Sequence, residues 1–202
     1  VTITKGLDGD IANTVEFVIF DDSTLSIETI KATYLGESSG NIDGTAGSDS
    51  LTGDSTNNLI QGFGGSDLLL GADGDDTIDG GSGLDTLQGD AGDDFLTGGS
   101  SSDQYRYQAG DGADTIQDVG SGTSDMIIVT GYTSNQLSFA RIGSDLVISL
   151  PGSGDSITVK NTLDGDSADS VELYQSDDTT LSLDDINSLY LGEGASTLEG
   201  TA

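Results

Sequence analysis

The chain has 202 residues and a formal net charge of −31 at pH 7, because 36 acidic residues are set against five basic ones. Only 33% of the residues are hydrophobic and 5% are aromatic, a composition that is thin for an ordinary core and typical of disorder. Such acidity argues against nucleic acid as a partner, and the lack of Cys and His excludes disulfides, Cys-ligated metal sites and a histidine base.

Residues 1–36 contain strand patterns at 1–4, 15–20 and 25–27 and a short helical pattern at 28–35. We interpret this segment as the C-terminal β flank of a preceding module, and the polar residues 37–43 as a connection. The opening residues favour a strand over a signal peptide, and no apolar run is long enough to span a membrane.

The next stretch, from Gly44 to Arg106, consists of seven copies of a nine-residue unit without gaps. Gly is first in every copy, as Gly44, Gly53, Gly62, Gly71, Gly80, Gly89 and Gly98. The fourth place holds Gly47, Gly65, Gly74, Gly83 and Gly92, with Thr56 and Ser101 in the other two copies. The sixth place holds Asp49, Asn58, Asp67, Asp76, Asp85, Asp94 and Asp103, and the eighth holds Leu51, Ile60, Leu69, Ile78, Leu87, Leu96 and Tyr105. A short fixed period is typical of stacked units that cannot bury their apolar face alone.

Each unit has a glycine-rich half and an apolar half, which predict different structures. Glycine tolerates positive φ, so the first half can turn tightly and aim its carbonyl oxygens inward. The last residues, such as Ser50–Thr52 or Thr77–Asp79, predict a very short strand with one apolar side chain inward. Two units then make one turn of a stacked coil, and loops two units apart face each other across a gap. Because carbonyls and two carboxylates line that gap, it is an oxygen cage suited to Ca²⁺.

The run resembles the RTX nonapeptide family, whose pattern is GGxGxDxUx. The resemblance extends over the whole run from Gly44 to Arg106, with Asp in six of the seven copies and a large hydrophobic residue in all seven. It implies an all-β fold, a right-handed parallel β-roll that binds Ca²⁺ between turns, and export by the type I secretion system of a Gram-negative bacterium. The second copy departs from the pattern at Thr56 and Asn58, so we expect a weaker site or a capping turn there.

The predicted Ca²⁺ ligands are Asp49, Asp67, Asp76, Asp85, Asp94 and Asp103, with Asn58 and the loop glycines Gly47, Gly65, Gly74, Gly83 and Gly92. Pairing units two apart gives five gaps, and only the gap between Asn58 and Asp76 lacks a second carboxylate. Beyond Arg106 the period breaks, but Gly110–Asp114 is similar to one further partial loop, in which Asp114 completes a sixth site. We therefore expect five or six Ca²⁺ ions. An Asp-rich turn array without metal is disfavoured, because its stacked carboxylates would repel one another.

The residues after the repeats predict a cap. We place the Ca²⁺-binding roll at 44–118 and a flanking antiparallel β cap at 119–192, with strands at 126–129, 137–141, 146–150, 157–159, 171–174 and 181–183. A last short helix through Tyr190 would be capped by Asp184 or Asp185. The patterns at 143–148 and 154–159 are similar to a domain often found beside haemolysin-type Ca²⁺-binding repeats, which implies that this flank caps the roll.

A longer repeat also runs through the chain, because residues 1–46 align without gaps on residues 157–202. On this interpretation 193–202 begins the next repeat module. The chain is then a window from a tandem array, in which the offset between the two aligned segments is the length of one module. Both copies contain an Asp-Gly-Asp loop, at 8–10 and 164–166, which we interpret as a plain turn in preference to a further metal site.

These features predict a Ca²⁺-dependent spacer module of a large secreted or cell-surface adhesin-like protein, unfolded at low Ca²⁺ for export and folded outside. Its partners would be Ca²⁺ and the neighbouring modules of the same chain, and we expect a monomer. The alternatives are a Ca²⁺-dependent module that binds extracellular glycans, or the secretion repeats of a larger enzyme. We expect no catalytic activity in the module itself, because no His activates its Ser residues and its paired carboxylates are too numerous to mark a dyad.

Overall fold

The structure, a computed structural model, describes residues 2–3, 17–19, 24–26, 40–120, 124–152, 154–163 and 171–191. The strands before and within the repeats are β1 Thr2–Ile3, β2 Phe17–Ile19, β3 Thr24–Ser26, β4 Asn41–Thr45, β5 Ser50–Thr52, β6 Leu59–Phe63, β7 Leu68–Asp73, β8 Thr77–Ser82, β9 Thr86–Ala91, β10 Phe95–Ser100 and β11 Gln104–Tyr107. Those after them are β12 Ala113–Ile116, β13 Met126–Val129, β14 Ser138–Ile142, β15 Asp145–Ser149, β16 Ser156–Val159, β17 Leu173–Gln175 and β18 Thr180–Ser182. The helices are the 3-10 helix η2 Ser134–Gln136 and α2 Leu183–Leu189. The predicted helix at 28–35, both Asp-Gly-Asp loops and residues 193–202 lie outside the described residues.

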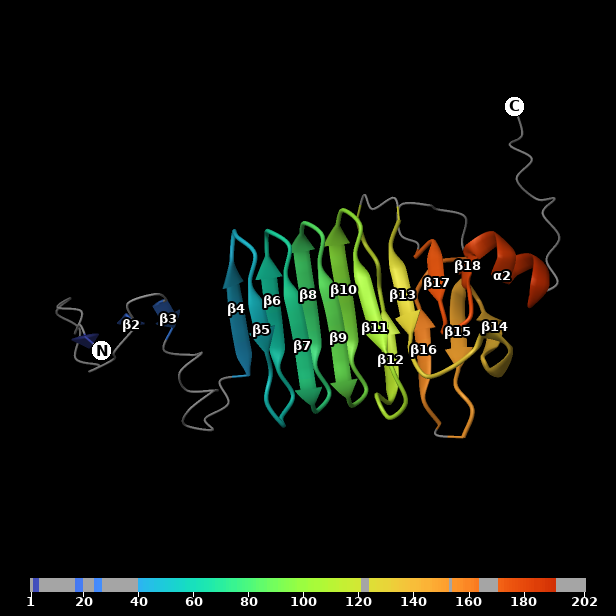
Figure 1. Cartoon of the computed structure of the whole chain (residues 1–202), viewed down its shortest axis with the longest axis horizontal. Coiled ribbons are helices and arrows are strands. Elements are labelled where there is room, and N and C mark those ends of the chain that lie inside the picture. The colour runs from blue at the N-terminus through green and yellow to red at the C-terminus, as the bar shows by residue number, and fades with distance from the viewer. Residues whose placement is uncertain are drawn as a thin grey trace, which may run out of the picture.

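The repeats form a flattened coil whose strands alternate between two sheets (Figure 1). One sheet has the order β14-β15-β16-β12-β10-β8-β6-β4, and the other has the order β18-β17-β13-β11-β9-β7-β5. Within the repeats each strand pairs in parallel with the strand two places later, as Leu51 with Leu69 and Leu69 with Leu87. The paired residues are two repeat units apart, so two nine-residue units make one coil. The structure thus confirms the predicted parallel β-roll.

The core of the roll is built from the eighth residue of each unit. Their side chains point inward and are at most 1% exposed from the second unit onward, at Ile60, Leu69, Ile78, Leu87, Leu96 and Tyr105. Burying one such side chain contributes about 1.5–3 kcal/mol, whereas fixing the backbone of a single residue costs about 1–2 kcal/mol. One inward hydrophobic residue in nine therefore offsets only a small part of the backbone entropy lost by its unit.

The predicted cap forms, and it is joined to the roll by strands that continue both sheets. β12 and β16 extend one sheet in parallel, and β13 and β17 extend the other. Antiparallel pairing occurs farther out, between β14, β15 and β16 and between β17 and β18. The parallel extension was not anticipated, because the interval between paired residues becomes longer than two repeat units for Leu96 with Ile116, and longer again for Tyr105 with Ile127.

The cap of helix α2 differs from the prediction. Ser182 is the N-cap residue, and its hydroxyl oxygen accepts a hydrogen bond from the backbone N–H of Asp185 at 3.2 Å. The Asp185 carboxylate in turn accepts from the backbone N–H of Ser182 at 2.9 Å. Asp185 is thus the third residue of a capping box rather than the cap itself.

The longer repeat seen in the sequence is present in the strand pairing. β2 and β3 pair in antiparallel fashion with Phe17 opposite Ser26, and β17 and β18 pair with Leu173 opposite Ser182. Both partners are shifted by the same interval that separates the aligned segments of the sequence. The two flanks therefore repeat the same hairpin.

Candidate metal centre

A ladder of carboxylates crosses the turns of the roll. The Oδ1 atom of Asp85 accepts a hydrogen bond from the backbone N–H of Asp67, one coil earlier, at 2.8 Å. The same contact joins Asp67 to Asp49, Asp76 to Asn58, Asp94 to Asp76 and Asp103 to Asp85, at 2.7 to 2.9 Å. Units two apart therefore face each other, as the spacing predicts.

The second oxygen of most of these carboxylates has no partner. The Oδ2 atoms of Asp67, Asp76, Asp85, Asp94, Asp103 and Asp114 are buried and accept no hydrogen bond from the protein. A buried, unsatisfied carboxylate oxygen is costly, and buried charges in proteins are normally paired or bound to metal. Lys160 pairs with Asp145 at 2.8 Å, on the cap rather than on these turns. The turns thus hold a row of negative charge that a bound cation would neutralise.

Burial also changes the acidity of these groups. Desolvation raises the pKa of Asp76 to about 6 and the pKa values of Asp94 and Asp103 to about 7, because an uncompensated charge is disfavoured away from water. The pKa of Asp114 rises to about 8 for the same reason. Without a cation, these four carboxyl groups therefore keep their protons to a higher pH than an ordinary Asp does.

The first glycine of a unit leaves a space beside the unsatisfied Oδ2 atom, which we call the orphan oxygen. A β-carbon on Gly80 would lie 2.6 Å from Oδ2 of Asp85 and 2.6 Å from the carbonyl oxygen of Gly98. At Gly62 and Gly71 the nearest atoms are again the orphan oxygen of the unit's own Asp and a glycine carbonyl oxygen of the next coil. A carboxylate oxygen and a carbonyl oxygen thus converge in the space beside each of these glycines, which we call a corner of the coil. This donor set suits Ca²⁺. The glycines predicted as ligands were those of the fourth place, so the first-place carbonyls are an addition to the predicted set.

The fourth-place glycines serve the stacking of the coils. Gly83 has φ of +130°, and a β-carbon there would collide with the carbonyl oxygen of Gly65 in the preceding coil. Gly65 itself (φ +110°) stacks in the same way on Gly47. Their positive φ values agree with the predicted tight turns, whereas their role as Ca²⁺ ligands, like that of Gly74 and Gly92, stays a prediction.

The predicted residues at the start of the roll are satisfied by their own loops. Oδ2 of Asp49 accepts the backbone N–H of Thr45 at 2.6 Å and its hydroxyl at 2.9 Å. Oδ1 of Asn58 accepts the backbone N–H of Asp54 at 2.8 Å. Asn58 thus fits the capping turn expected for the second unit, whereas the role of Asp49 as a Ca²⁺ ligand stays a prediction. Their partners in the next coil, Asp76 and Asp67, keep orphan oxygens.

At the other end, the ladder continues beyond the predicted residues. Oδ1 of Asp114 accepts a hydrogen bond from the backbone N–H of Asp94 at 3.1 Å, so the two residues predicted to line the sixth gap lie next to each other. Asp125, missed by the sequence analysis, accepts the N–H of Asp103 at 2.7 Å, and its own N–H is donated to Glu172 at 2.9 Å. A signal was available for Asp125, because it immediately precedes the strand predicted at 126–129, as every sixth-place Asp of the repeats immediately precedes its strand.

Comparison with known proteins agrees with this geometry. The family model for the RTX calcium-binding nonapeptide repeat (four copies) matches residues 43–78 and 70–105. Residues 43–105 are RTX calcium-binding nonapeptide repeats. A second model, the haemolysin-type calcium binding protein related domain, matches residues 145–180 in the cap. The chain, called the RTX module below for these repeats, thus contains a Ca²⁺-binding segment at residues 43–105.

Among solved structures, the RTX module is similar to the solution structure of the AlgE6R3 subunit from the Azotobacter vinelandii mannuronan C5-epimerase. The match has 24% identity and a TM-score of 0.26, and it covers 58% of this chain and 72% of the other. A search of curated proteins gives no significant match. In the part of the chain that the structure describes, no helix is long and apolar enough to cross a membrane.

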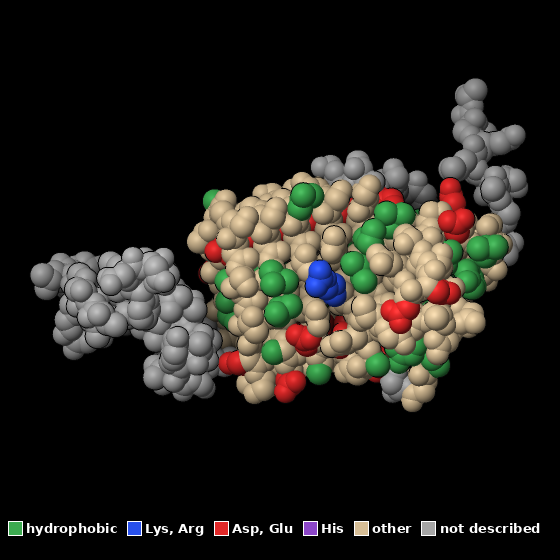
Figure 2. All heavy atoms as spheres, viewed as in Figure 1, with side chains coloured by type: hydrophobic (Ala, Val, Ile, Leu, Met, Phe, Trp, Pro, Cys, Tyr) green, Lys and Arg blue, Asp and Glu red, His purple; other side chains and the backbone are tan. Residues whose placement is uncertain are grey.

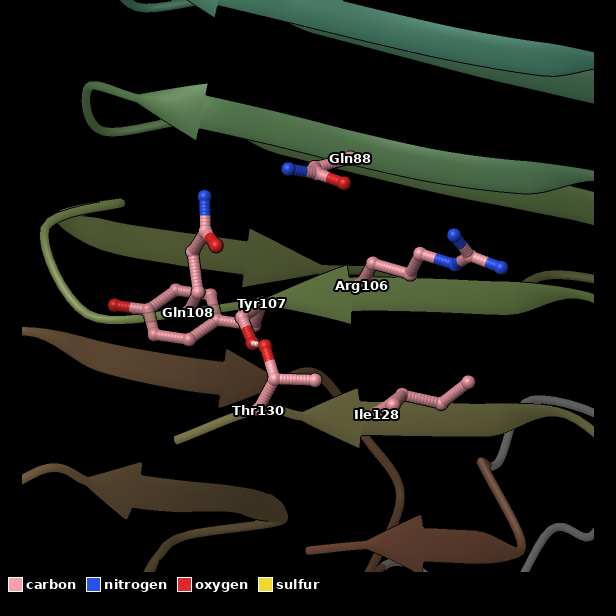
Figure 3. Close-up of a pocket in the computed structure, with 6 residues that line it drawn as sticks. All are labelled: Gln88, Arg106, Tyr107, Gln108, Ile128 and Thr130. Atoms are coloured by element: carbon pink, nitrogen blue, oxygen red, sulfur yellow. Dashed lines mark hydrogen bonds between the residues drawn. The ribbon is translucent and has the colours of Figure 1, made fainter. Parts of the chain in front are cut away.

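Away from the turns, the outer face of the RTX module carries a shallow hollow. Its volume is about 230 Å³, and it lies over β9, β11 and β13 (Figure 3). The residues lining it are Gln88, Arg106, Tyr107, Gln108, Ile128 and Thr130. The side chains of Gln88, Arg106 and Ile128 stand on adjacent strands, at positions that pair in the sheet. Figure 2 shows a basic patch on a face that is mostly backbone and neutral polar atoms.

Proposed function

We propose that this chain is a Ca²⁺-dependent folding spacer, an extender module of a large secreted or surface RTX repeat protein of the adhesin type. The observation that carries the proposal is the row of six buried Asp oxygens without a hydrogen-bond donor. Those of Asp67, Asp76 and Asp85 lie in corners where a carbonyl oxygen also converges, and the chain has only five basic residues to set against 36 acidic ones.

Ca²⁺ would supply the stability that the thin core lacks. Extracellular modules bind Ca²⁺ with Kd on the order of 10⁻⁴–10⁻³ M. At a free concentration about tenfold above Kd, each independent site adds about 1.4 kcal/mol. Five such sites add roughly 7 kcal/mol, which is comparable to the whole stability of a typical domain. Folding and Ca²⁺ binding would then be one event.

The same physics accounts for export. At the low free Ca²⁺ inside a cell, the charge of −31 and the single inward hydrophobic residue per unit would keep the chain open and able to thread a type I secretion channel. Outside a Gram-negative cell, Ca²⁺ would close the turns. The repeated hairpins β2–β3 and β17–β18 support a tandem array, in which folded modules extend the parent chain.

The test is a Ca²⁺ titration of the chain, followed by circular dichroism, small-angle scattering and calorimetry. We expect loss of the β signal and an expanded particle in chelator, recovery with Ca²⁺ once the five or six gaps of the roll are filled, and much weaker recovery with Mg²⁺, which demands octahedral geometry and keeps its water. A compact β-rich chain in chelator would refute the proposal.

Carbohydrate binding is a second candidate function, and the hollow around Arg106 favours it. Arg106, Gln88 and Gln108 offer hydrogen-bond donors on a rigid sheet, which suits the hydroxyl or carboxylate groups of a sugar. The volume of this hollow, about 230 Å³, is below the usual range for small-molecule pockets. A glycan array with and without Ca²⁺ separates the two functions, because a specific hit lost on Arg106→Ala would replace the spacer proposal with a binding module.

A third candidate is that the repeats serve the export of a larger enzyme. Our proposal assigns no catalytic step to this module, since the chain contains neither His nor Cys and its carboxylates sit in repeated turns. A repeated module also exceeds what a single secretion tail needs.

A further inference from the structure

Asp118 occupies a position in the sheet at which each repeat unit has its first-place glycine. Strands β10 and β12 pair through Leu96 and Ile116, so two residues farther on Gly98 lies level with Asp118. In all seven repeat units this place is Gly, and its lack of a side chain leaves the corner of the coil open. At Asp118 a carboxylate therefore enters the corner that the repeats keep free.

In that corner, Asp118 meets two other carboxylates. One oxygen atom each of Asp103, Asp118 and Asp125 lie within 4.8 Å of one another, and the three residues are 0%, 3% and 2% exposed. The hydroxyl of Tyr105 donates to Asp118 at 3.3 Å and accepts the N–H of Gly98 at 2.8 Å. Tyr105 stands where the other six units have Leu or Ile, so both departures from the repeat lie at the same point.

An orphan oxygen points into this group independently of the clustering. Oδ2 of Asp103 is buried and has no hydrogen-bond partner. It lies beside the Tyr105 hydroxyl, because both oxygens would contact a β-carbon built on Gly98. The Tyr105 hydroxyl donates to Asp118 and leaves the Asp103 oxygen without a donor.

No basic side chain of the described residues compensates the three carboxylates. Arg106 is exposed on the outer face of β11, and Lys160 is paired with Asp145 on the cap. Arg141 donates to the carbonyl oxygens of Gly143 and Leu163. Three buried carboxyl groups at this spacing can all be ionised only if a cation neutralises them, since otherwise they retain protons.

We propose that Asp103, Asp118 and Asp125 bind a Ca²⁺ ion at the junction between the roll and the cap, outside the nonapeptide pattern. The donors are all oxygens, which favours a hard cation. Asp103 precedes β11, Asp118 follows β12 and Asp125 precedes β13. One ion bound by all three therefore connects the last repeat coil to the first strands of both sheets beyond it. The ion thus links the repeats to their cap.

The test compares the Ca²⁺ stoichiometry of the whole chain with that of Asp118→Asn and Asp118→Gly by isothermal titration calorimetry. Asp118→Gly restores the residue of the repeat column, so it removes the carboxylate without adding bulk. Asp43→Asn, which changes an exposed carboxylate on β4, is the control. We expect either Asp118 variant to bind one ion fewer, and the control to bind the full number.

Tb³⁺ in place of Ca²⁺ gives a second readout, because the Tyr105 ring next to the site can sensitise its emission. We expect emission from the unmodified chain to fall in Tyr105→Phe and in both Asp118 variants. Unchanged stoichiometry in a folded Asp118 variant, or no tyrosine-sensitised emission from the unmodified chain, would overturn the proposal. These failures differ from failure of the spacer function, in which the unmodified chain would not gain β structure with Ca²⁺ at all.

Discussion

The unpartnered Oδ2 of Asp85 and the α-carbon of Gly80 share one corner of the coil, and a β-carbon on Gly80 would come within 2.6 Å of that oxygen. The first glycine of a unit is thus required for close approach. Its φ is not in the left-handed region, in contrast to that of the fourth-place Gly83. The corner has room for an ion only while residue 80 lacks a side chain.

Gly80→Ala should therefore weaken Ca²⁺ binding and destabilise the Ca²⁺-bound fold. Overpacking of this kind costs about 1–3 kcal/mol, and we expect a lower unfolding midpoint in saturating Ca²⁺. Gly47→Ala is the matched control, because it keeps the backbone carbonyl predicted as a ligand and its β-carbon would have the Thr45 hydroxyl, at 3.8 Å, as its nearest neighbour. Equal effects of the two substitutions on Ca²⁺ affinity would contradict the role assigned to Gly80.

Asn58→Asp should strengthen one site. Asp76 already accepts the backbone N–H of Asn58 at 2.7 Å, but this gap has a single carboxylate. A second one would raise the affinity of that site about tenfold, or about 1.4 kcal/mol, measured by calorimetry. Asn57→Asp adds the same charge at an exposed neighbour and should leave the affinity nearly unchanged. A tighter site in both variants would point to net charge rather than to the gap.

Leu87→Ala should destabilise the Ca²⁺-bound roll strongly. Leu87 is fully buried between coils, and removing such a side chain costs about 2–5 kcal/mol. Leu84 is 60% exposed, so Leu84→Ala should change the stability by less than about 0.5 kcal/mol. Denaturant unfolding in saturating Ca²⁺ measures both, and similar midpoints would show that the eighth-place column is not the core.

Acid should partly replace Ca²⁺. Burial raises the folded-state pKa values of Asp94 and Asp103 to about 7 and of Asp114 to about 8, above the ordinary value near 4. Raised folded-state pKa values mean that the folded chain binds protons more tightly, so this stability is present below about pH 4 and is lost as the pH rises through 6 to 8.

The Ca²⁺-free chain should thus give a larger β signal by circular dichroism at pH 4.5 than at pH 7.5. Asp114→Asn, which carries no charge at either pH, should reduce the difference by raising the signal at pH 7.5. A Ca²⁺-free signal that is larger at pH 7.5 would mean that the carboxylates are not the groups that oppose folding.

The roll could be predicted from the sequence wherever the period is strict. Each buried eighth-place residue and each sixth-place Asp lies where a nine-residue count puts it, because two units close one coil. The count fails at β12 and β13, where the intervals between paired residues exceed two units and admit longer turns. Asp118 and Asp125 were therefore missed, although they face the same ladder. The sequence also does not show why the first place must be Gly. The reason is a close approach of atoms from the next coil, and a contact between coils leaves no pattern in the neighbouring residues.

The Oδ1 ladder gives the roll a polarity. Each sixth-place backbone N–H is donated to an acidic residue that lies later in the chain, ending where Asp125 donates to Glu172, while the second oxygen of Asp49 bonds within its own loop. Removing coils from the N-terminal end would leave each remaining sixth-place N–H with its carboxylate acceptor, whereas cutting at the cap would take the carboxylate acceptor from the sixth-place N–H of the last turn. For this set of contacts the cap is consequently the end that supplies the last acceptor.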